Sequence, residues 1–438
     1  MNWEALLSLR RHGDTTKRIR KEQDEIRLGF EVDYDRIVFS SYFRSLQDKT
    51  QVIPFSKTDF VHTRLTHSLE VSVVARSLGR LAGKELLKRH PHLQEIHGYQ
   101  PNDFGAIVAA AALAHDIGNP PFGHSGEKAI GHYFESGEGK QFQAQLTKEE
   151  YEDLCRFEGN ANGFKLLTES MEGTPGGLRL SYATLGAYMK YPKGSLPRKP
   201  TAHVADKKFG FFQSEKKFFA EIASEMELTK GTGNNRHPLA FLVEAADDIC
   251  YTIIDFEDGI NLGWISEDFA LEYLIKLVKD HMDTEKYAGL KHTAQRMSYL
   301  RSLAINSLIL DAVNMFLAHE EEILAGTFSH ALLDKSKYKA QMDDIIAISI
   351  DKVYRSDEVL QKEIVGYKVI STLLSAFCKA AVNKLHHSTS PYDELILRLI
   401  PQGTPMVEES LYKTVLNASC FVASLSDGKA MELAKKMN

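Results

Sequence analysis

The residues best suited to chemistry are two histidines and two aspartates in stretches that otherwise look like helical core. His67 follows Arg64 by three residues, so both lie on one face of a helix. His115 and Asp116 end an alanine-rich segment, and Asp247 lies in another apolar segment. Each could be a core residue with a polar partner, because an unpaired buried imidazole or carboxylate is costly. Together they predict a site for one divalent metal ion. Two imidazoles and two carboxylates suit Mn, Fe, Co, Ni or Zn, and they suit Mg less well.

A second pair with chemical potential follows directly. A Gly/Pro-rich turn leads from His115-Asp116 to His124 and, three residues later, to Glu127. If Glu127 lies at the start of the next helix, its carboxylate can hold the His124 imidazole in one tautomer and raise its basicity. General acid–base catalysis needs that arrangement. The alternative is a helix-capping arrangement that does no chemistry.

The elements that must position these residues are predominantly helical. Apolar residues recur every three to four positions from Leu65 onward and predict a helix that ends near Gly83. Phe104–His115 has almost no polar face, which predicts a buried central helix. A third helix starts at Pro238 and runs to about residue 258. We therefore expect an all-α fold with one small β-hairpin near residues 50–63.

Composition limits the class of protein. The chain has 438 residues, is 43% hydrophobic and carries a net charge of −6, so it can form a sizeable core but offers no global positive field for nucleic acid. Its four cysteines form no CxxC pair, which argues against a zinc knuckle and favours a reducing compartment. The longest apolar run, Ala106–Ala114, is too short to span a bilayer, and Met1-Asn2-Trp3-Glu4 lacks the positive n-region and the apolar h-region of a secretory signal. We expect a cytoplasmic protein without a membrane span.

The chain divides into three regions without a sharp boundary. Residues 1–35 are a charge-dense N-terminal arm, which could be a solvated segment or bind an anion. Residues 36–260 hold all the candidate site residues and form the expected catalytic core. Residues 261–438 contain further amphipathic helices that we expect to pack on the core rather than fold as an independent domain.

Longer strings resemble a known family, the deoxyguanosine triphosphate triphosphohydrolases, within the HD-domain metal-dependent phosphohydrolases. His67, His115-Asp116 and Asp247 match the H…HD…D signature of these enzymes. Ser45 departs from the pattern, since many members carry a second arginine after Arg44. Beyond about residue 260 little is similar. The segments that resemble the family, in its order, are 35–44, 48–52, 115–127, 157–161, 182–186 and 244–251.

The resemblance implies an activity and a role for each candidate residue. It implies hydrolysis of a deoxynucleoside triphosphate, dGTP first, to the deoxynucleoside and inorganic triphosphate by water attack at the α-phosphorus. His124 would be the acid–base group and Glu127 its orienting partner. Each active site would bind one divalent metal ion. Mn or Mg is the preferred candidate, and Co, Fe, Ni or Zn are the alternatives. The implied metal ligands are His67, His115, Asp116 and Asp247.

The resemblance also implies a set of substrate-binding residues. Arg64 and Lys190 would contact the triphosphate. Tyr251 and Asp255 follow Asp247 at intervals of four residues and so share its helix face, although such a stripe is often only a solvated edge. The residues that would meet the deoxyribose are Gln51, Val52, Tyr251 and Asp255.

Partners and competing functions complete the expectation. Family members form homo-oligomers, some tetrameric and some hexameric, and some respond to a second, regulatory dNTP. Basic and aromatic residues alternate in 207–212 and 216–219, which predicts either weak single-stranded nucleic-acid binding or the edge of a helix or loop near the phosphates. The alternatives are another HD phosphohydrolase, acting on a nucleoside monophosphate or an alarmone, and a catalytically silent regulator that binds nucleotides or single strands.

Overall fold

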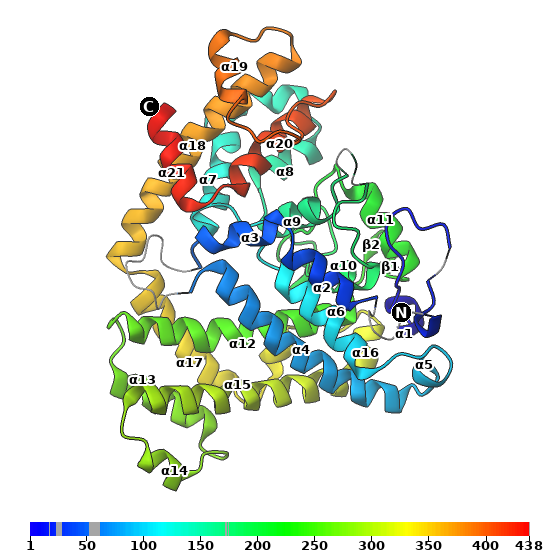
Figure 1. Ribbon diagram of the computed structural model, residues 1–438, viewed down its shortest axis with the longest axis vertical. Helices are drawn as coiled ribbons and strands as arrows, with labels where there is room; N and C mark the ends of the chain where they lie inside the picture. The colour runs from blue at the N-terminus through cyan, green and yellow to red at the C-terminus, as the bar shows by residue number, and fades with distance from the viewer. Residues whose placement is uncertain (17, 23–28, 52–61, 171–172, 174, 438) are drawn as a thin grey trace.

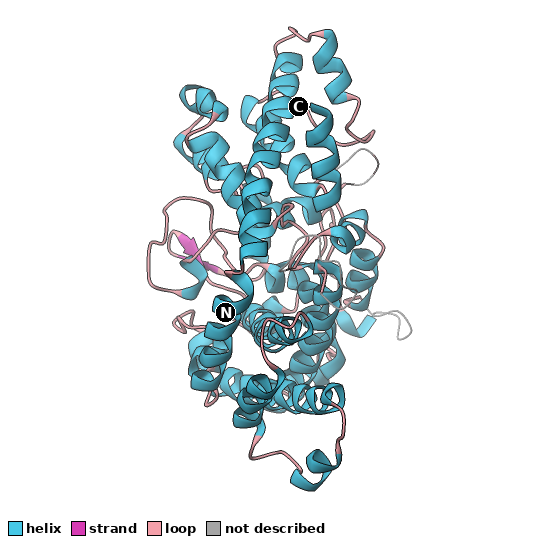
Figure 2. Cartoon of the chain, turned by 90° about the vertical axis from the view of Figure 1, so that its left-hand side faces the viewer, coloured by secondary structure: helices cyan, strands magenta, loops and turns pink. Residues whose placement is uncertain are grey.

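A computed structural model describes residues 1–438 except 17, 23–28, 52–61, 171–172, 174 and 438. Helices supply nearly all of the regular structure described (Figures 1 and 2), which confirms the expected all-α class. The first α-helices in chain order are α1 (Trp3–Leu6), α2 (Glu31–Val38), α3 (Ser41–Arg44), α4 (Arg64–Arg89), α5 (His92–Glu95), α6 (Pro101–Ala114), α7 (Gly123–Glu135), α8 (Lys148–Cys155), α9 (Gly159–Thr168), α10 (Tyr182–Tyr188) and α11 (Lys216–Glu225).

The second half of the chain continues the same architecture. Its α-helices are α12 (Pro238–Asn261), α13 (Glu267–Val278), α14 (Thr284–Gly289), α15 (Thr293–Ala318), α16 (Glu320–Leu324), α17 (Lys339–Ser349), α18 (Asp357–Leu385), α19 (Pro391–Leu397), α20 (Leu411–Ser424) and α21 (Asp427–Met437). The short helices of other geometry are η1 (Arg20–Glu22), η2 (Ser45–Asp48), η3 (Glu138–Gln145), η4 (Val204–Asp206), η5 (Leu332–Lys335) and the π-helical η6 (Ile350–Tyr354).

The described β-sheet lies away from the expected hairpin. Most of the strand pair expected near 50–63 falls outside the described residues, and its two ends, Thr50 and Thr63, form one antiparallel bridge. The sheet that the structure describes pairs β1 (Thr229–Lys230) with β2 (Gly233–Asn234). Its turn contains Gly231 at φ +59°, a conformation that glycine adopts readily. These two-residue strands are not predictable from the sequence, because strands so short carry no alternating pattern.

Helices α4 and α6 pack closely along each other and form the centre of the fold (Figure 1). The expectation that the first helix ends near Gly83 is wrong, because α4 continues to Arg89. A Cβ atom on Gly79 would lie 2.6 Å from the Phe104 carbonyl oxygen, and one on Gly83 would lie 2.6 Å from the Phe104 ring. Both glycines therefore permit close helix contact, and Gly83 is not a helix terminator.

Helix α12 has the predicted start and extends slightly past the predicted end. Pro238 occupies its first turn, and the His237 side chain caps it by accepting a hydrogen bond from the Leu239 amide at 3.1 Å. α12 contacts α4, α6 and α10, so it brings Asp247 close to His115 at the end of α6. The three segments that carry the candidate metal ligands therefore meet in one place.

Two hydrophobic cores lie on either side of this centre. The larger core includes the interior faces of α4, α6, α12 and α15. The second core joins α7 and α8 to the C-terminal helices α18, α20 and α21, which form the upper part of Figure 1. The C-terminal helices therefore pack directly on the helix that carries His124 and Glu127.

The described part of the N-terminal segment lies against the larger core. Trp3 is 3% exposed, and its indole nitrogen donates to Glu320 at 2.9 Å. Arg11 forms a 2.5 Å ion pair with Asp33, and Arg20 one of 2.9 Å with Asp103. Both of these buried guanidinium groups thus have carboxylate partners within the protein.

Two helices are long and apolar enough to cross a membrane by length and composition. They are Thr293–Ala318 and Val359–Leu385. Half of the apolar window of each is buried inside the fold. Core helices of water-soluble proteins have the same character, so these two helices are weak evidence for a membrane span.

Candidate active site

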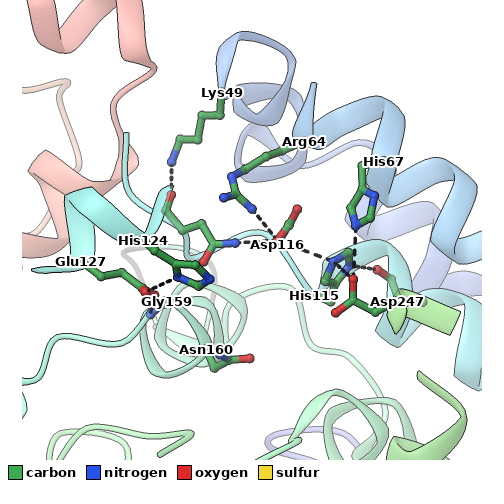
Figure 3. A network of polar contacts seen from close by, with 12 residues as sticks. Lys49, Arg64, His67, His115, Asp116, His124, Glu127, Gly159, Asn160 and Asp247 are labelled. Carbon is green, nitrogen blue, oxygen red and sulfur yellow. Dashed lines mark hydrogen bonds and ion pairs between the residues drawn. The ribbon is translucent and has the colours of Figure 1, made fainter. Parts of the chain in front are cut away.

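Four side chains from α4, the end of α6 and α12 converge as the sequence predicts (Figure 3). One ligand atom from each of His67, His115 and Asp116 lies within 4.8 Å of the other two. The fourth residue, Asp247, is joined to this group through its Oδ1 atom. That oxygen is 3.2 Å from His67 Nε2 and 3.5 Å from His115 Nε2.

The hydrogen bonds of this cluster leave ligand atoms free for a cation. His115 Nδ1 is 2.6 Å from the Ala112 carbonyl oxygen, which can only accept, so Nδ1 carries the proton and Nε2 keeps its lone pair toward the cluster. Asp116 Oδ2 is buried without a hydrogen-bond partner among the described residues. A buried carboxylate oxygen without a partner is costly unless something else compensates it. The donor set therefore fits a divalent metal ion.

Two basic side chains balance the carboxylates. Arg64 donates to Asp116 Oδ1 at 2.7 Å, and Lys190 donates to Asp247 Oδ2 at 2.7 Å. Burial disfavours the charged form of Asp247, but Lys190 and His115 outweigh that cost and hold the pKa of Asp247 well below its ordinary value. The pKa of Asp116 is likewise lowered against burial, chiefly by Arg64. Both carboxylates are therefore anionic at neutral pH.

The second predicted pair also forms the predicted contact. Glu127 lies in the second turn of α7, and its Oε2 is 2.8 Å from His124 Nδ1. Its Oε1 accepts a hydrogen bond from the Gly159 amide at 2.8 Å. Burial opposes ionisation of Glu127, but Lys208 and His124 lower its pKa, so the carboxylate is the acceptor and His124 Nδ1 the donor. Neither side chain caps α7, so the helix-capping alternative does not apply.

One cavity of about 510 Å³ is lined by members of both groups. His115, Asp116 and Asp247 lie on its wall, and so does His124. Figure 3 shows the imidazole of His124 across this space from the His67–His115–Asp247 group. The cavity can therefore hold a cation and present a proton-transfer group to the same bound molecule.

The predicted substrate residues are only partly at this cavity. Gln51, Arg64, Lys190 and Tyr251 line it. Asp255 is fully buried and does not line the cavity; it accepts a hydrogen bond from the Tyr354 hydroxyl. Val52 lies outside the described residues.

Sequence reasoning missed several residues of this cavity. Tyr354 lines it and stacks on Tyr251, with ring centroids 5.7 Å apart and an interplanar angle of 22°. Lys208, from the 207–212 segment that the sequence places only in general terms near the phosphates, lines it and forms a 2.9 Å ion pair with Glu158. Asn119 donates to Asp116 Oδ1 at 2.5 Å. Asn119 lies inside the 115–127 string, so its proximity to Asp116 could have been inferred, whereas no local pattern marks Tyr354.

The aromatic residues of 207–212 and 216–219 do not form a base-stacking surface. Phe209, Phe211, Phe212 and Phe219 are each at most 5% exposed and belong to the two cores. Phe218 is partly buried and packs against Phe164 and Tyr182. The expectation of single-strand stacking on these rings is therefore wrong, since stacking requires an accessible aromatic face. The alternative, a loop near the phosphates, is closer to the structure, because Lys207 and Lys208 line the same cavity as the candidate metal ligands His115, Asp116 and Asp247.

Comparison with known proteins agrees with this geometry. Residues 64–251, which span all the candidate metal ligands, match the HD domain family. A protein of Synechocystis called deoxyguanosinetriphosphate triphosphohydrolase-like is 39% identical over 449 residues, covering 100% of this chain and 99% of the relative. A protein of Listeria monocytogenes with the same description is 31% identical, again over 100% of this chain and 99% of the relative.

A third relative carries the name without the qualifier. It is the deoxyguanosinetriphosphate triphosphohydrolase of Klebsiella pneumoniae, 32% identical over 86% of this chain and 80% of its own length. The chain belongs to the deoxyguanosinetriphosphate triphosphohydrolase family. The similarity to the first two relatives extends through the C-terminal third, where sequence analysis alone found little resemblance. As an HD-domain member of this family the chain is a hydrolase, and its His-His-Asp cluster can bind the metal that the class requires.

Proposed function

We propose that the protein hydrolyses deoxynucleoside triphosphates, dGTP preferentially, to the deoxynucleoside and inorganic triphosphate. The observation that supports this most is that one cavity is lined by His115, Asp116 and Asp247 of the candidate metal cluster and by His124, whose imidazole Glu127 holds from outside the cavity wall. Relatives named as deoxyguanosinetriphosphate triphosphohydrolases support the choice of substrate. The reaction would be attack of water at the α-phosphorus, with cleavage of its bond to the 5′-oxygen.

The metal would be held by His67, His115, Asp116 and Asp247. A divalent ion bound there, manganese or magnesium first, would supply Lewis-acid polarisation of the α-phosphate. Arg64 and Lys190 hold the two carboxylates through ion pairs of 2.7 Å, so they fix the ligands and add positive charge beside the triphosphate.

His124 would move the proton at the scissile bond. Its Nδ1–H donates to Glu127, so Nε2 is the atom that can take or give a proton. The imidazole side chain is 75% exposed, whereas the Glu127 side chain is 10% exposed. A fixed anchor thus holds an accessible ring at the cavity, where it can reach a bound phosphate ester.

The sugar would lie against Tyr251, with Gln51 close by. Gln51 Oε1 is buried and has no hydrogen-bond partner among the described residues, so a ligand donor could satisfy it. Asp255 accepts from Tyr354 through Oδ2, and its Oδ1 is buried without a hydrogen-bond partner among the described residues, so Oδ1 is the atom that would accept from a 3′-hydroxyl. Discrimination against a 2′-hydroxyl by crowding is assigned to Val52 on the sequence resemblance alone.

The wider setting is part of the same proposal. We propose a cytoplasmic homo-oligomer, tetrameric or hexameric, with a second dNTP as regulator. Exposed apolar side chains on α18 and α19, such as Ile364 (72% exposed) and Leu395 (57%), would suit a subunit contact. Sedimentation of the protein with and without dNTPs measures the assembly directly.

A product assay tests the proposed activity. Each of the four dNTPs is supplied alone and in pairs, with Mg²⁺ or Mn²⁺, and the products are separated by anion exchange. We expect inorganic triphosphate and the deoxynucleoside, fastest from dGTP. Release of single phosphates or pyrophosphate, or hydrolysis of nucleoside monophosphates or alarmones instead, would indicate another HD phosphohydrolase. Tight nucleotide binding without any turnover would indicate a silent regulator.

A further inference from the structure

A buried carboxylate of the C-terminal region holds two loops of the cavity together. Asp427 begins α21 and is 2% exposed. Its Oδ2 accepts hydrogen bonds from the Thr50 amide at 3.2 Å and the Thr50 hydroxyl at 2.6 Å. Its Oδ1 accepts one from the Phe122 amide at 3.0 Å. One side chain therefore joins segments that lie 377 and 305 residues earlier in the chain.

Both segments belong to the cavity wall, whereas Asp427 does not. Thr50 and Gln51 line the cavity from one loop, and Phe122, Gly123 and His124 line it from the turn that leads into α7 and from its first residues. The carboxylate lies behind them and contacts no candidate metal ligand in the hydrogen bonds and ion pairs of the described residues. Its effect on the cavity is therefore exerted through the positions of the two loops.

The turn that carries His124 has a backbone that needs such support. Phe122 has φ +62° and Gly123 has φ +57°, so two successive residues are in the left-handed region. A non-glycine residue such as Phe122 rarely adopts this conformation unless its surroundings enforce it. The hydrogen bond from the Phe122 amide to Asp427 is one of the contacts that enforce it.

Helices α18 and α20 support the same turn from neighbouring positions. Ser125 donates to Glu363 of α18 at 2.5 Å. A Cβ atom at Gly366 would lie 2.8 Å from the Phe122 side chain, so the glycine leaves room for that ring. Lys49 donates to the Asn119 carbonyl at 2.6 Å and to the Ala423 carbonyl of α20 at 2.7 Å. Helix α18 thus contacts the turn directly, and α20 is linked to its other end through Lys49.

We propose that Asp427 is a positioning residue that sets where His124 lies relative to the metal ligands. This inference rests on the proposed function, because it assigns His124 to the reaction. The metal ligands lie on α4, the end of α6 and α12, which Asp427 does not hold. Loss of the carboxylate should therefore displace His124 and the Thr50–Gln51 loop while the metal site stays intact.

The kinetic test compares Asp427 with a matched aspartate. Asp393 lies in the first turn of α19, is 4% exposed and accepts hydrogen bonds from Asn383 and Ser390, far along the chain from any site residue. Asp427→Ala should lower kcat about 100-fold, as expected for a displaced catalytic group, with Mn²⁺ affinity unchanged. Asp427→Asn should be intermediate, since the amide oxygen can still accept from one loop. Asp393→Ala should destabilise the protein and leave kcat within about two-fold.

Amide hydrogen exchange provides a readout that does not need activity. In Asp427→Ala, exchange should accelerate at Thr50 and across 119–125, whereas Asp393→Ala should leave both unchanged. If Asp427→Ala does not fold, the same kinetic and exchange measurements are made on Asp427→Asn. Equal kcat losses in the Asp427 and Asp393 variants, loss of Mn²⁺ binding in an Asp427 variant, or unchanged exchange at 119–125 would each overturn the proposal. If the wild-type protein hydrolyses no dNTP, the proposed function fails, and the exchange measurement still decides whether Asp427 positions this turn.

Discussion

His124 and Glu127 form a 2.8 Å hydrogen bond that joins an exposed imidazole to a buried carboxylate. The second carboxylate oxygen of Glu127 is held by the Gly159 amide at the start of α9, so the anchor of the imidazole is itself fixed. Both partners lie on α7, three residues apart, and therefore face the same side of that helix. The proposed mechanism assigns proton transfer to this pair and metal binding to His67, His115, Asp116 and Asp247, so the two roles can be tested separately.

His124→Ala and His115→Ala should separate these two roles. His124→Ala should lower kcat by about 10²–10⁴-fold, the usual contribution of general acid–base catalysis, and should leave Mn²⁺ bound. His115→Ala should abolish both turnover and Mn²⁺ binding, because it removes a ligand from the cluster. Mn²⁺ titration by electron paramagnetic resonance, together with initial rates, measures both quantities. His132→Ala, an exposed histidine on the same helix, is the control and should change neither. Undiminished turnover in His124→Ala would contradict its assigned role.

Gly118→Ala should destabilise the protein strongly. A Cβ atom at Gly118 would lie 1.9 Å from the Gly159 carbonyl oxygen and 2.1 Å from the Gly163 amide nitrogen, and backbone atoms cannot move aside as a flexible side chain can. We expect a loss of about 3 kcal/mol or more in the free energy of unfolding, measured by urea denaturation. Gly428→Ala is the matched control, because nothing lies within 4 Å of its Cβ position. It should change stability by no more than about 1 kcal/mol.

The sequence predicts those residues of the candidate site that lie close together in the chain or recur at helical spacing along one segment. The HD pair at the end of an apolar helix, the turn to His124 and the regular pattern around Asp247 are all local signals. Asp427 and Tyr354 reach the cavity through contacts with residues about 100 to 380 positions away, which no local pattern encodes. Gly83 could not be interpreted correctly from the sequence for a different reason. A glycine at the end of an apolar helical pattern is typical of a helix end, but this glycine makes room for the Phe104 ring of another helix.

Lys49 should make stability depend on pH in a predictable direction. Burial and the charge of Arg64 lower its pKa from 10.5 to about 7, against the opposing effect of Asp427 and Asp116. Between these values the unfolded chain binds more protons than the folded protein, so this group makes the free energy of unfolding rise with pH. The contribution is at most about 1.4 kcal/mol per pH unit.

The measurement compares wild type with Lys49→Met in the presence of a chelator. Urea unfolding at about pH 6, 7.5 and 9 gives the free-energy difference between the two proteins. The wild type should gain stability relative to Lys49→Met as the pH rises above about 7, with no gain below it. A difference that stays constant or falls over the higher range would show that the Lys49 ammonium is not destabilised by burial.

The position of bond cleavage tests the central claim most directly. The metal-loaded protein hydrolyses dGTP in ¹⁸O-labelled water, and mass spectrometry locates the label in the products. Attack of water at the α-phosphorus predicts deoxyguanosine without label and inorganic triphosphate that carries one labelled oxygen. Label in deoxyguanosine, or products in which the triphosphate chain is broken, would contradict the account.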